Sequence, residues 1–276
     1  MNPSIKPRII EALAQPWSVN RTLELAGGGE GPLWPNSRAI ITTVEVSYEA
    51  ARRWLPAALE PTEVPMATVF VVEYPECTFM PPYREASVVL HARHRRKNVF
   101  FCAWIVVDDD TPMMMGREQI GLPKKLAQID FELGEDGLGV GVVRRRGIEI
   151  LRLEAKAATP SQELDYLFPD NTIGVRGFLS VLPGAMWSIC LPQEIVRGWK
   201  AQTALTIGSS PFDPLEELGV RQSEWPGQVL ISHLGVPRER RRFNPIHSLT
   251  RFLPTLRPVG FVSHRWMLEN LYFRTL

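Results

Sequence analysis

Two adjacent lysines are the residues of this sequence best suited to covalent chemistry. The chain has 276 residues and 31 basic side chains, of which only six are lysines, yet Lys124 and Lys125 stand side by side. Arginine stays protonated near neutral pH, whereas a lysine that is desolvated or lies beside another cation can lose its proton. The free amine attacks ketones and forms a Schiff base. The spacing alone indicates either such a nucleophile or a solvated turn.

The residues before the two lysines predict the local structure that positions them. Residues 108–127 read DDDTPMMMGREQIGLPKKLA. The three aspartates favour the start of a helix over a metal cluster, because carboxylates suit the positive end of a helix and Pro112 fits its first position. This helix runs through Met113–Met115. The turn Gly121–Pro123 then puts both lysines on irregular backbone or at the start of a strand, among apolar neighbours that lower a lysine pKa.

The rest of the chain supplies mainly strands, which are recognised by alternating or continuous apolar runs and by β-branched residues. Ser47 is the expected N-cap of a short helix that ends before Pro56 and turns Trp54 and Leu55 to the core. The predicted class is α+β, a mostly antiparallel sheet wrapped as a cone or barrel around a central cavity, in one domain whose residues 1–33 form a peripheral arm. Strands are expected at residues 39–46, 66–73, 84–92, 98–107, 130–133, 138–143, 148–155, 204–207 and 229–233, and helices at 48–55, 113–115, 162–167, 193–200 and 266–273.

Composition argues against several classes of protein. A net charge of +1 does not favour a nucleic-acid partner, although arginine clusters occur. The longest apolar run has nine residues, half of what a membrane helix requires. Three cysteines without CxxC spacing indicate neither a disulfide framework nor a zinc site, so a cytoplasmic setting is expected.

The segment around the lysines resembles a known family. GRE-x₄-PKKLA, preceded by an acidic turn and an apolar helix and followed by a β-meander, is similar to the acetoacetate decarboxylase family. Tyr83-Arg84-Glu85 resembles the Tyr-x-Glu that opens a strand in that family, and Asn36-Ser37-Arg38 resembles its N-terminal arginine segment. The similarity can be followed from about residue 34 to residue 155, with a faint echo at residues 262–264.

The resemblance implies roles for individual residues. Lys124 corresponds to the Schiff-base nucleophile and Lys125 to the cation that activates it, Glu85 to a pocket carboxylate, and Arg38 to its ion-pair partner or a carboxylate anchor. A second family carboxylate has no clean counterpart, since Val69 or Phe70 stands in its place and Glu73 follows. The remaining candidates are Met114, Tyr83 and Phe70 for the substrate pocket, and Arg117 and Glu118 for supporting ion pairs.

Three functions follow from this similarity. The first is decarboxylation of a β-keto acid through a lysine imine, without metal, flavin or nicotinamide. The second is an aldolase or dehydratase that uses the same imine with pyruvate or another oxo acid and an aldehyde. The third is a non-catalytic module that binds a small anion. The resemblance also implies a homo-oligomer. The apolar residues of the segment 266–273 indicate either a contact face of such an oligomer or burial within the subunit; they are Trp266, Leu268, Leu271, Tyr272 and Phe273.

Overall fold

One large sheet contains most of the chain that the structure describes. The computed structural model describes residues 32–56, 58–117, 121–167, 172–175, 186–220, 224–235 and 238–243. The strand order is β14-β11-β10-β5-β4-β3-β1-β13-β12-β9-β8-β7, with β2 paired to β4 and β6 to β5. Among the described strands, all neighbours are antiparallel except β10 and β6, which run parallel to β5. The bounds are β1 Trp34–Glu45, β2 Glu60–Pro61, β3 Met66–Tyr74, β4 Tyr83–His94, β5 Lys97–Val107, β6 Lys124–Leu126, β7 Gln128–Leu133, β8 Gly139–Arg145, β9 Ile148–Pro160, β10 Thr172–Val175, β11 Met186–Cys190, β12 Gln193–Ile207, β13 Glu224–Leu234 and β14 Arg238–Phe243.

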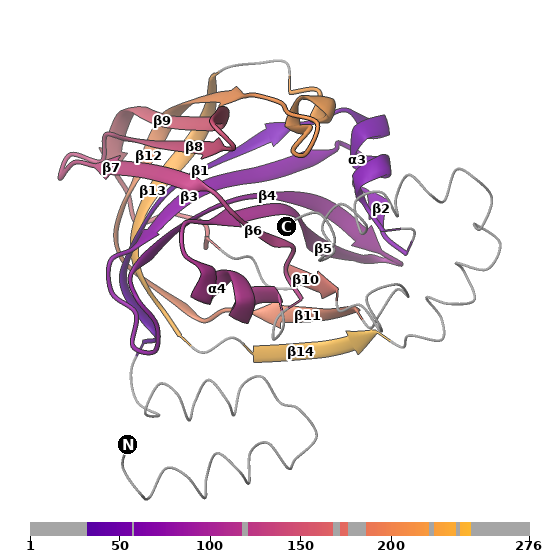
Figure 1. Cartoon of the computed structure of the whole chain (residues 1–276), viewed down its shortest axis with the longest axis horizontal. Helices are drawn as coiled ribbons and strands as arrows, with labels where there is room; N and C mark the ends of the chain where they lie inside the picture. Colours follow the sequence, from indigo (N-terminus) through magenta and orange to yellow (C-terminus); the bar gives the residue numbers. More distant parts are fainter. Residues whose placement is uncertain are drawn as a thin grey trace, which may run out of the picture.

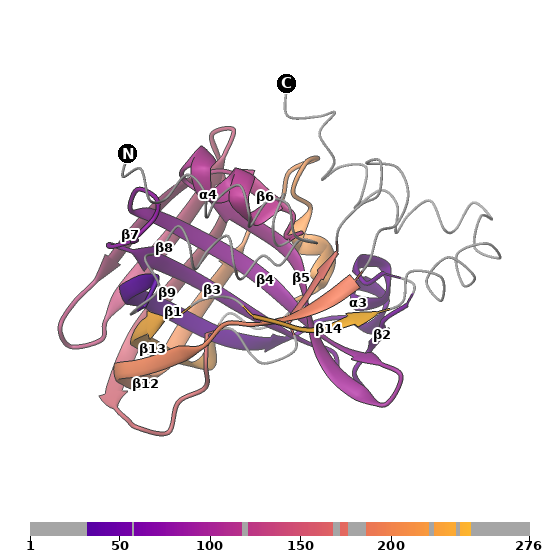
Figure 2. The same ribbon diagram turned by 90° about the horizontal axis from the view of Figure 1, so that it is seen from below.

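The two lysines lie where this sheet nearly closes into a barrel. Strands β6 and β7 are separated only by Ala127, whose backbone N–H donates to the Val107 carbonyl at 2.9 Å. Because β6 pairs with β5 and β7 pairs with β8, this stretch joins the two sides of the curved sheet. Figures 1 and 2 show β7, β8 and β9 folded across β1, β3 and β4. The predicted fold class, a barrel-like and mostly antiparallel sheet with few helices, is confirmed.

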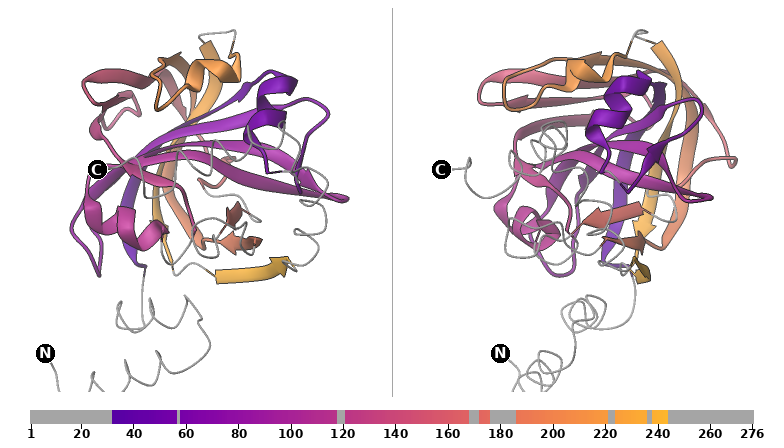
Figure 3. Two further views of the ribbon diagram at one scale, coloured as in Figure 1. Left: turned by 45° about the vertical axis from the view of Figure 1, so that its right-hand side comes forward. Right: turned by 90° about the vertical axis from the view of Figure 1, so that its right-hand side faces the viewer.

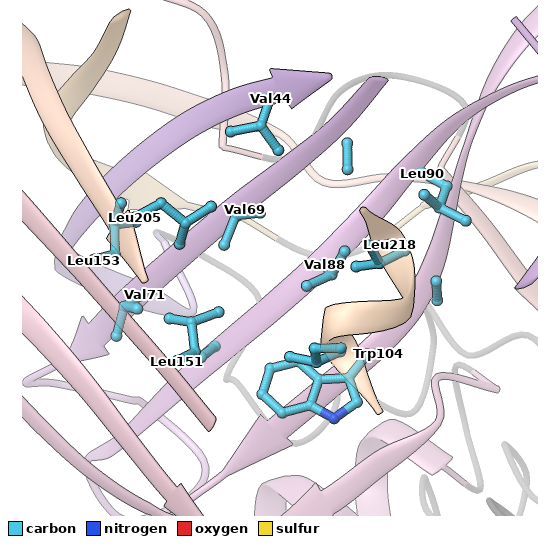
Figure 4. Close-up of a cluster of buried hydrophobic side chains, with 14 of the residues drawn as sticks. Val44, Val69, Val71, Val88, Leu90, Trp104, Leu151, Leu153, Leu205 and Leu218 are labelled. Carbon is cyan, nitrogen blue, oxygen red and sulfur yellow. The ribbon is translucent and has the colours of Figure 1, made fainter. Parts of the chain in front are cut away.

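The interior of the barrel is an apolar core. Side chains of a strand alternate between the two faces of a sheet, so every second residue points inward. The inward set includes Val69 and Val71 of β3, Val88 of β4 and Leu151 and Leu153 of β9, all fully buried. Figure 4 shows these side chains converging from strands that are distant in sequence. This packing fixes which face of each strand points outward.

The outward face of the same strands carries a second buried cluster. Its members include Phe70, Tyr74 and Tyr83, which alternate with the inward-facing residues of β3 and β4. Beyond β5 the sheet continues through β10, β11 and β14, and this end bends around the outer face near the helix α4, Asp110–Met115 (Figures 1 and 3). Met113 and Met115 pack against the outer cluster. The candidate site lies within it.

Each of the two short α-helices begins directly after a residue whose side chain caps its first turn. Helix α3, Tyr48–Trp54, begins after Ser47, whose side chain accepts a hydrogen bond from the Ala50 N–H at 3.1 Å, and it ends before Pro56 as predicted. Helix α4 begins after Asp109, which accepts from the Thr111 N–H at 2.9 Å. The predicted position of Pro112 is wrong: it is the third helical residue, because Asp109 rather than a later residue caps the helix. The 3₁₀ helix η2 spans Leu215–Leu218.

Two predicted helices are wrong. Residues 193–200 belong to strand β12, where pairing with β9 and β13 outweighs local helix preference. Residues 162–167 form no helix. The predicted strands within residues 39–155, 204–207 and 229–233 are confirmed with small changes of bounds. The N-terminal arm before residue 32 and residues 262–264 and 266–273 lie outside the described residues.

Candidate active site

Strand alternation sends the two lysines to opposite faces of the sheet. Lys124 lies opposite Ile105 of β5, on the outward face, and Lys125 lies opposite Val106, on the inward face. Both side chains are buried. The two lysines therefore lie on different faces of β6, and each pairs with a carboxylate of its own.

Lys124 makes a short ion pair with Glu85. Its Nζ donates to Glu85 Oε2 at 2.6 Å, and the two side chains are only 7% and 3% exposed. Glu85 lies on β4 opposite Val107 of β5. Ile105, two residues before Val107, lies between Ser87 of β4 and Lys124 of β6. The sheet register thus brings the two predicted site residues together across β5. A buried pair at this distance is a strong, charge-assisted hydrogen bond.

Two tyrosines surround this pair. Burial, helped by the charge of Glu85, raises the pKa of Tyr74 and of Tyr83 well above the usual value, so both hydroxyls stay protonated. An interaction between the Tyr74 hydroxyl and the Glu85 carboxylate contributes to the rise in the Tyr74 pKa. The Tyr83 ring lies with its centroid 5.6 Å from Lys124 Nζ and 4.6 Å from the centroid of the Tyr74 ring. The tyrosines supply neutral donors and apolar ring surface next to the amine.

The pair opens into a small cavity of about 70 Å³. Since one water-sized group needs about 10–15 Å³, the cavity has room for roughly five to seven non-hydrogen atoms, the size of a short keto acid. The surface of the cavity is mostly apolar. The described lining residues are Trp34, Tyr74, Tyr83, Glu85, Ser87, Val89, Cys102, Ile105, Leu122, Lys124, Thr172, Leu191 and Leu234.

Cys102 and Ser87 line the cavity together with Lys124. Burial raises the pKa of Cys102 to about 12, and its Sγ lies 3.5 Å from Ser87 Oγ. The Ser87 hydroxyl donates to the Trp104 carbonyl at 2.9 Å, where β4 and β5 change register. At neutral pH the thiol therefore carries no charge and acts as a polarisable wall of the cavity.

Lys125 belongs to a separate buried cluster. Its Nζ donates to Asp213 Oδ1 at 3.0 Å and to the Phe212 carbonyl at 3.3 Å. Asp213 also accepts from Trp104 Nε1 at 2.9 Å and from Arg145 Nε at 2.7 Å. Burial raises the pKa of the Asp213 carboxyl, but Lys125 and Arg145 outweigh this effect and leave the pKa lowered. This cluster anchors β6 to the barrel from inside.

Arg38 does not reach Glu85. Its Nη1 lies 3.2 Å from Glu73 Oε2, and Glu73 in turn pairs with Arg84 at 3.1 Å. Arg38, Glu73 and Arg84 lie opposite one another on β1, β3 and β4. Arg84 is adjacent to Glu85 in sequence, so these three side chains point to the face of the sheet opposite to that of Glu85. The expected Arg38–Glu85 ion pair is therefore wrong, and Glu73 does not provide a second carboxylate in the cavity.

The remaining predicted site residues also include one that lines the cavity and others that do not. Tyr83 lines the cavity, whereas Met114 is 57% exposed and Phe70 packs in the outer cluster without lining it. The prediction that Met114 lines the pocket is wrong, because its side chain is exposed whereas the neighbouring Met113 and Met115 pack against the outer cluster. Arg117 donates to the Lys124 carbonyl at 2.9 Å and so supports the backbone of β6. Glu118 lies outside the described residues.

Gly116 is a site residue that sequence reasoning did not assign. A Cβ at this position would lie 2.5 Å from both Cδ and Cε of Lys124, so the lysine side chain passes directly over the glycine. The signal was present in the GRE motif, but its distance from Lys124 in sequence hid the contact. Asp213 had no comparable signal, because it is 88 residues from Lys125.

Metal-binding clusters and membrane-spanning helices are not found in the part of the chain that the structure describes. Among those residues, no group of three or more histidine, cysteine, aspartate or glutamate side chains is arranged to hold a metal ion. In the same part of the chain, the helices are too short or too polar to cross a membrane.

Comparison with known proteins identifies the relatives of this fold. A sequence model described as acetoacetate decarboxylase matches residues 22–224. Acetoacetate decarboxylase 3 of Mesorhizobium japonicum is 33% identical over 88 residues, 32% of this chain and 34% of the relative. Acetoacetate decarboxylase 1 of Bradyrhizobium diazoefficiens is 31% identical over 98 residues, 36% of this chain and 39% of the relative. Both matches therefore span little more than a third of the curated relatives.

Solved structures share the fold at low sequence identity. Acetoacetate decarboxylase from Legionella pneumophila superposes with a TM-score of 0.66 and 16% identity, over 78% of this chain and 88% of that one. The enduracididine biosynthesis enzyme MppR, complexed with the condensation product of pyruvate and imidazole 4-carboxaldehyde, gives 0.60 and 18%, over 74% and 87%. At such low sequence identity, these similarities show a shared fold alone.

Proposed function

Because the chain belongs to the acetoacetate decarboxylase family, we propose that it is a Schiff-base-forming lyase that decarboxylates a small β-keto acid through an imine on Lys124. The observation that carries the proposal is the 2.6 Å pair of Lys124 and Glu85 in a small, mostly apolar cavity. The apolar walls and neutral tyrosines suit a reaction in which charge moves from the carboxylate to departing carbon dioxide.

The first steps need a free amine and a proton carrier. Transfer of one proton from Lys124 Nζ to Glu85 leaves two neutral groups in the cavity, and the amine lone pair then attacks the ketone carbon. The ketone oxygen is protonated, and loss of water from the carbinolamine gives the protonated imine. Glu85, in direct contact with Nζ, is the group suited to return the proton that water carries away.

The imine then acts as the electron sink. The bond between the α-carbon and the carboxylate breaks, carbon dioxide leaves, and the electron pair forms an enamine with the nitrogen of Lys124. Protonation of the enamine carbon and hydrolysis of the resulting imine release the ketone and restore the amine. Each turnover takes up one proton from solvent, which ends on the former enamine carbon, and the sequence needs no oxidant or reductant.

The proposal is tested by borohydride reduction during incubation with acetoacetate. The wild-type protein should form a stable adduct visible by intact mass, and untreated reactions should yield acetone and carbon dioxide. Lys124→Arg should abolish both, whereas Lys156→Arg, a change at an exposed ion pair with Glu224, should leave them unaltered. Absence of an adduct with every keto acid tested would contradict the proposal and favour the anion-binding alternative.

An aldolase or dehydratase is the second candidate. The likeness to MppR, whose complex contains a product of pyruvate and an aldehyde, favours it, as does the position of Glu73 outside the cavity. Incubation with pyruvate and an aldehyde distinguishes the two candidates by product. A condensed acid without carbon dioxide from acetoacetate would favour the aldolase, and acetone from acetoacetate would favour the decarboxylase.

A further inference from the structure

The indole of Trp34 has a buried N–H donor that makes no hydrogen bond within the part of the chain that the structure describes. Trp34 is 7% exposed, and its Nε1 is the one buried side-chain nitrogen or oxygen of the described residues without a partner in hydrogen-bond geometry. A donor buried in this way is unfavourable, and proteins retain few of them. Because Trp34 lines the cavity that holds Lys124, a ligand in the cavity can supply the missing acceptor.

The backbone around Trp34 is held in an unusual conformation. The register of β1 and β13 shifts between Trp34 and Ser37, and Asn36 has a φ of 56°, which a residue other than glycine seldom adopts. The Ser37 hydroxyl donates to the Trp34 carbonyl at 3.1 Å, and the Asn36 N–H donates to His233 Nδ1 at the same distance. The ring itself packs edge-on against Phe79, with centroids 5.2 Å apart. The indole is thus fixed before any ligand binds.

A second neutral donor lies beside it. The Tyr83 hydroxyl interacts with the Trp34 indole, which slightly opposes the rise in the Tyr83 pKa caused by burial and by Glu85. The two groups do not reach hydrogen-bond geometry with each other. Both donors are therefore available to one acceptor group. Two adjacent N–H and O–H donors match a carboxylate, which offers two oxygens and about four acceptor positions.

Trp34 and Tyr83 line the same cavity as Lys124. The Tyr83 ring centroid is 5.6 Å from Lys124 Nζ. From an imine nitrogen to a carboxylate oxygen of a β-keto acid there are four bonds of about 1.5 Å, which span roughly 5 Å. A substrate joined to Lys124 is therefore long enough to reach the part of the cavity that Tyr83 and Trp34 line.

We propose that Trp34 Nε1 and the Tyr83 hydroxyl form a two-donor subsite for the carboxylate of the keto acid, and so select acids over neutral ketones. The assignment rests on the proposed function for the identity of the ligand. Neutral donors orient the carboxylate without the strong ion pair that a guanidinium would make, which suits a group that must leave as carbon dioxide.

The test separates carboxylate binding from imine formation. 3-Hydroxybutyrate carries the carboxylate but has no ketone, and acetone has the ketone without the carboxylate. Trp34→Phe keeps an aromatic ring and removes the N–H. We expect calorimetry to give a Kd for 3-hydroxybutyrate about 10-fold to 100-fold higher than in the wild type, as loss of a hydrogen bond to a charged group predicts. Borohydride trapping of acetone should change less than twofold.

Two further variants complete the design. Trp225→Phe, at a tryptophan of similar burial in the barrel core, should leave both ligands unaffected. Tyr83→Phe should weaken 3-hydroxybutyrate binding in the same way, and it provides the test if Trp34→Phe does not fold. No binding of 3-hydroxybutyrate to the wild type, or equal losses for acid and ketone, would overturn the subsite. If the wild type forms no imine but Trp34→Phe still weakens 3-hydroxybutyrate, the proposed function fails and the subsite stands.

Discussion

Replacing Gly116 by alanine should disable the proposed nucleophile while the protein remains folded. The backbone of Gly116 is helical, with φ of −64° and ψ of −38°, so alanine causes no backbone strain there. Its Cβ would lie 2.5 Å from two carbons of the Lys124 side chain. Carbon atoms in contact prefer about 3.5–4.0 Å, so the lysine must move by about 1 Å. The 2.6 Å contact of Nζ with Glu85 is the first interaction that such a movement disrupts.

The size of the effect follows from that displacement. A misplacement of about 1 Å at a reacting group costs about 100-fold in rate, equivalent to about 2.7 kcal/mol of activation free energy. Crowding should cost about 1–3 kcal/mol in the free energy of unfolding. The higher helix propensity of alanine offsets part of that cost, by about 1 kcal/mol. We therefore expect a folded Gly116→Ala protein whose imine forms at least 100-fold more slowly.

The assay compares trapping rate and thermal stability in two glycine variants. Gly147 has a φ of +79°, and a Cβ added there would meet nothing within 4 Å, so Gly147→Ala should destabilise the protein by about 1–2 kcal/mol without touching the site. With acetoacetate and borohydride, Gly147→Ala should react at the wild-type rate and Gly116→Ala should not. A Gly116→Ala protein that traps substrate within threefold of the wild-type rate would refute the assigned contact between Gly116 and Lys124.

Three further predictions follow from the buried polar groups. Glu85→Gln cannot exchange a proton with the amine and should slow imine trapping by about 10²–10⁴-fold at neutral pH, whereas a loss below threefold would exclude a role in proton transfer. Asp213→Asn leaves Lys125 and Arg145 without their shared carboxylate and should cost about 3–5 kcal/mol in the free energy of unfolding, measured by denaturant titration. Folding lowers the pKa of Asp213, so its contribution to the free energy of unfolding is complete above the usual value of 3.8 and is lost as pH falls through the lower folded value. The stability advantage of the wild type over Asp213→Asn should therefore persist from pH 8 to pH 5 and shrink only in stronger acid. Cys102, with a pKa of about 12, should resist iodoacetamide at pH 8 in the native protein and react after unfolding, and rapid native alkylation detected by peptide mass would contradict its assigned burial.

Local signals in the sequence were sufficient for much of the barrel. The alternating run in β4 and the continuous apolar run in β5 identify strands because their faces are buried differently, and Ser47 identifies a helix start through one hydrogen bond to a nearby N–H. Strand β12 was mistaken for a helix over residues 193–200. Its conformation is determined by pairing with β9 and β13, which no local window of sequence contains.

The site was predictable to the extent that it depends on neighbours in sequence or on the family motif. Lys124 and Glu85 were identified, and they meet because the register of β4, β5 and β6 aligns them. Lys125 has a different environment because side chains alternate along β6, and the sequence left open whether the two lysines lie on irregular backbone or at the start of a strand. Its partner Asp213 lies 88 residues further along the chain, so the ion pair can be recognised only in the folded structure.

The central claim, that Lys124 rather than Lys125 forms the imine, is tested most directly by locating the reduced adduct within one peptide. The protein is treated with acetoacetate and borohydride, digested, and the peptide containing both lysines is fragmented between them. We expect the added isopropyl group, left after decarboxylation and reduction, on the Lys124 amine alone. An adduct on Lys125, or one divided equally between the two lysines, would contradict the assignment of opposite faces and separate roles to this pair.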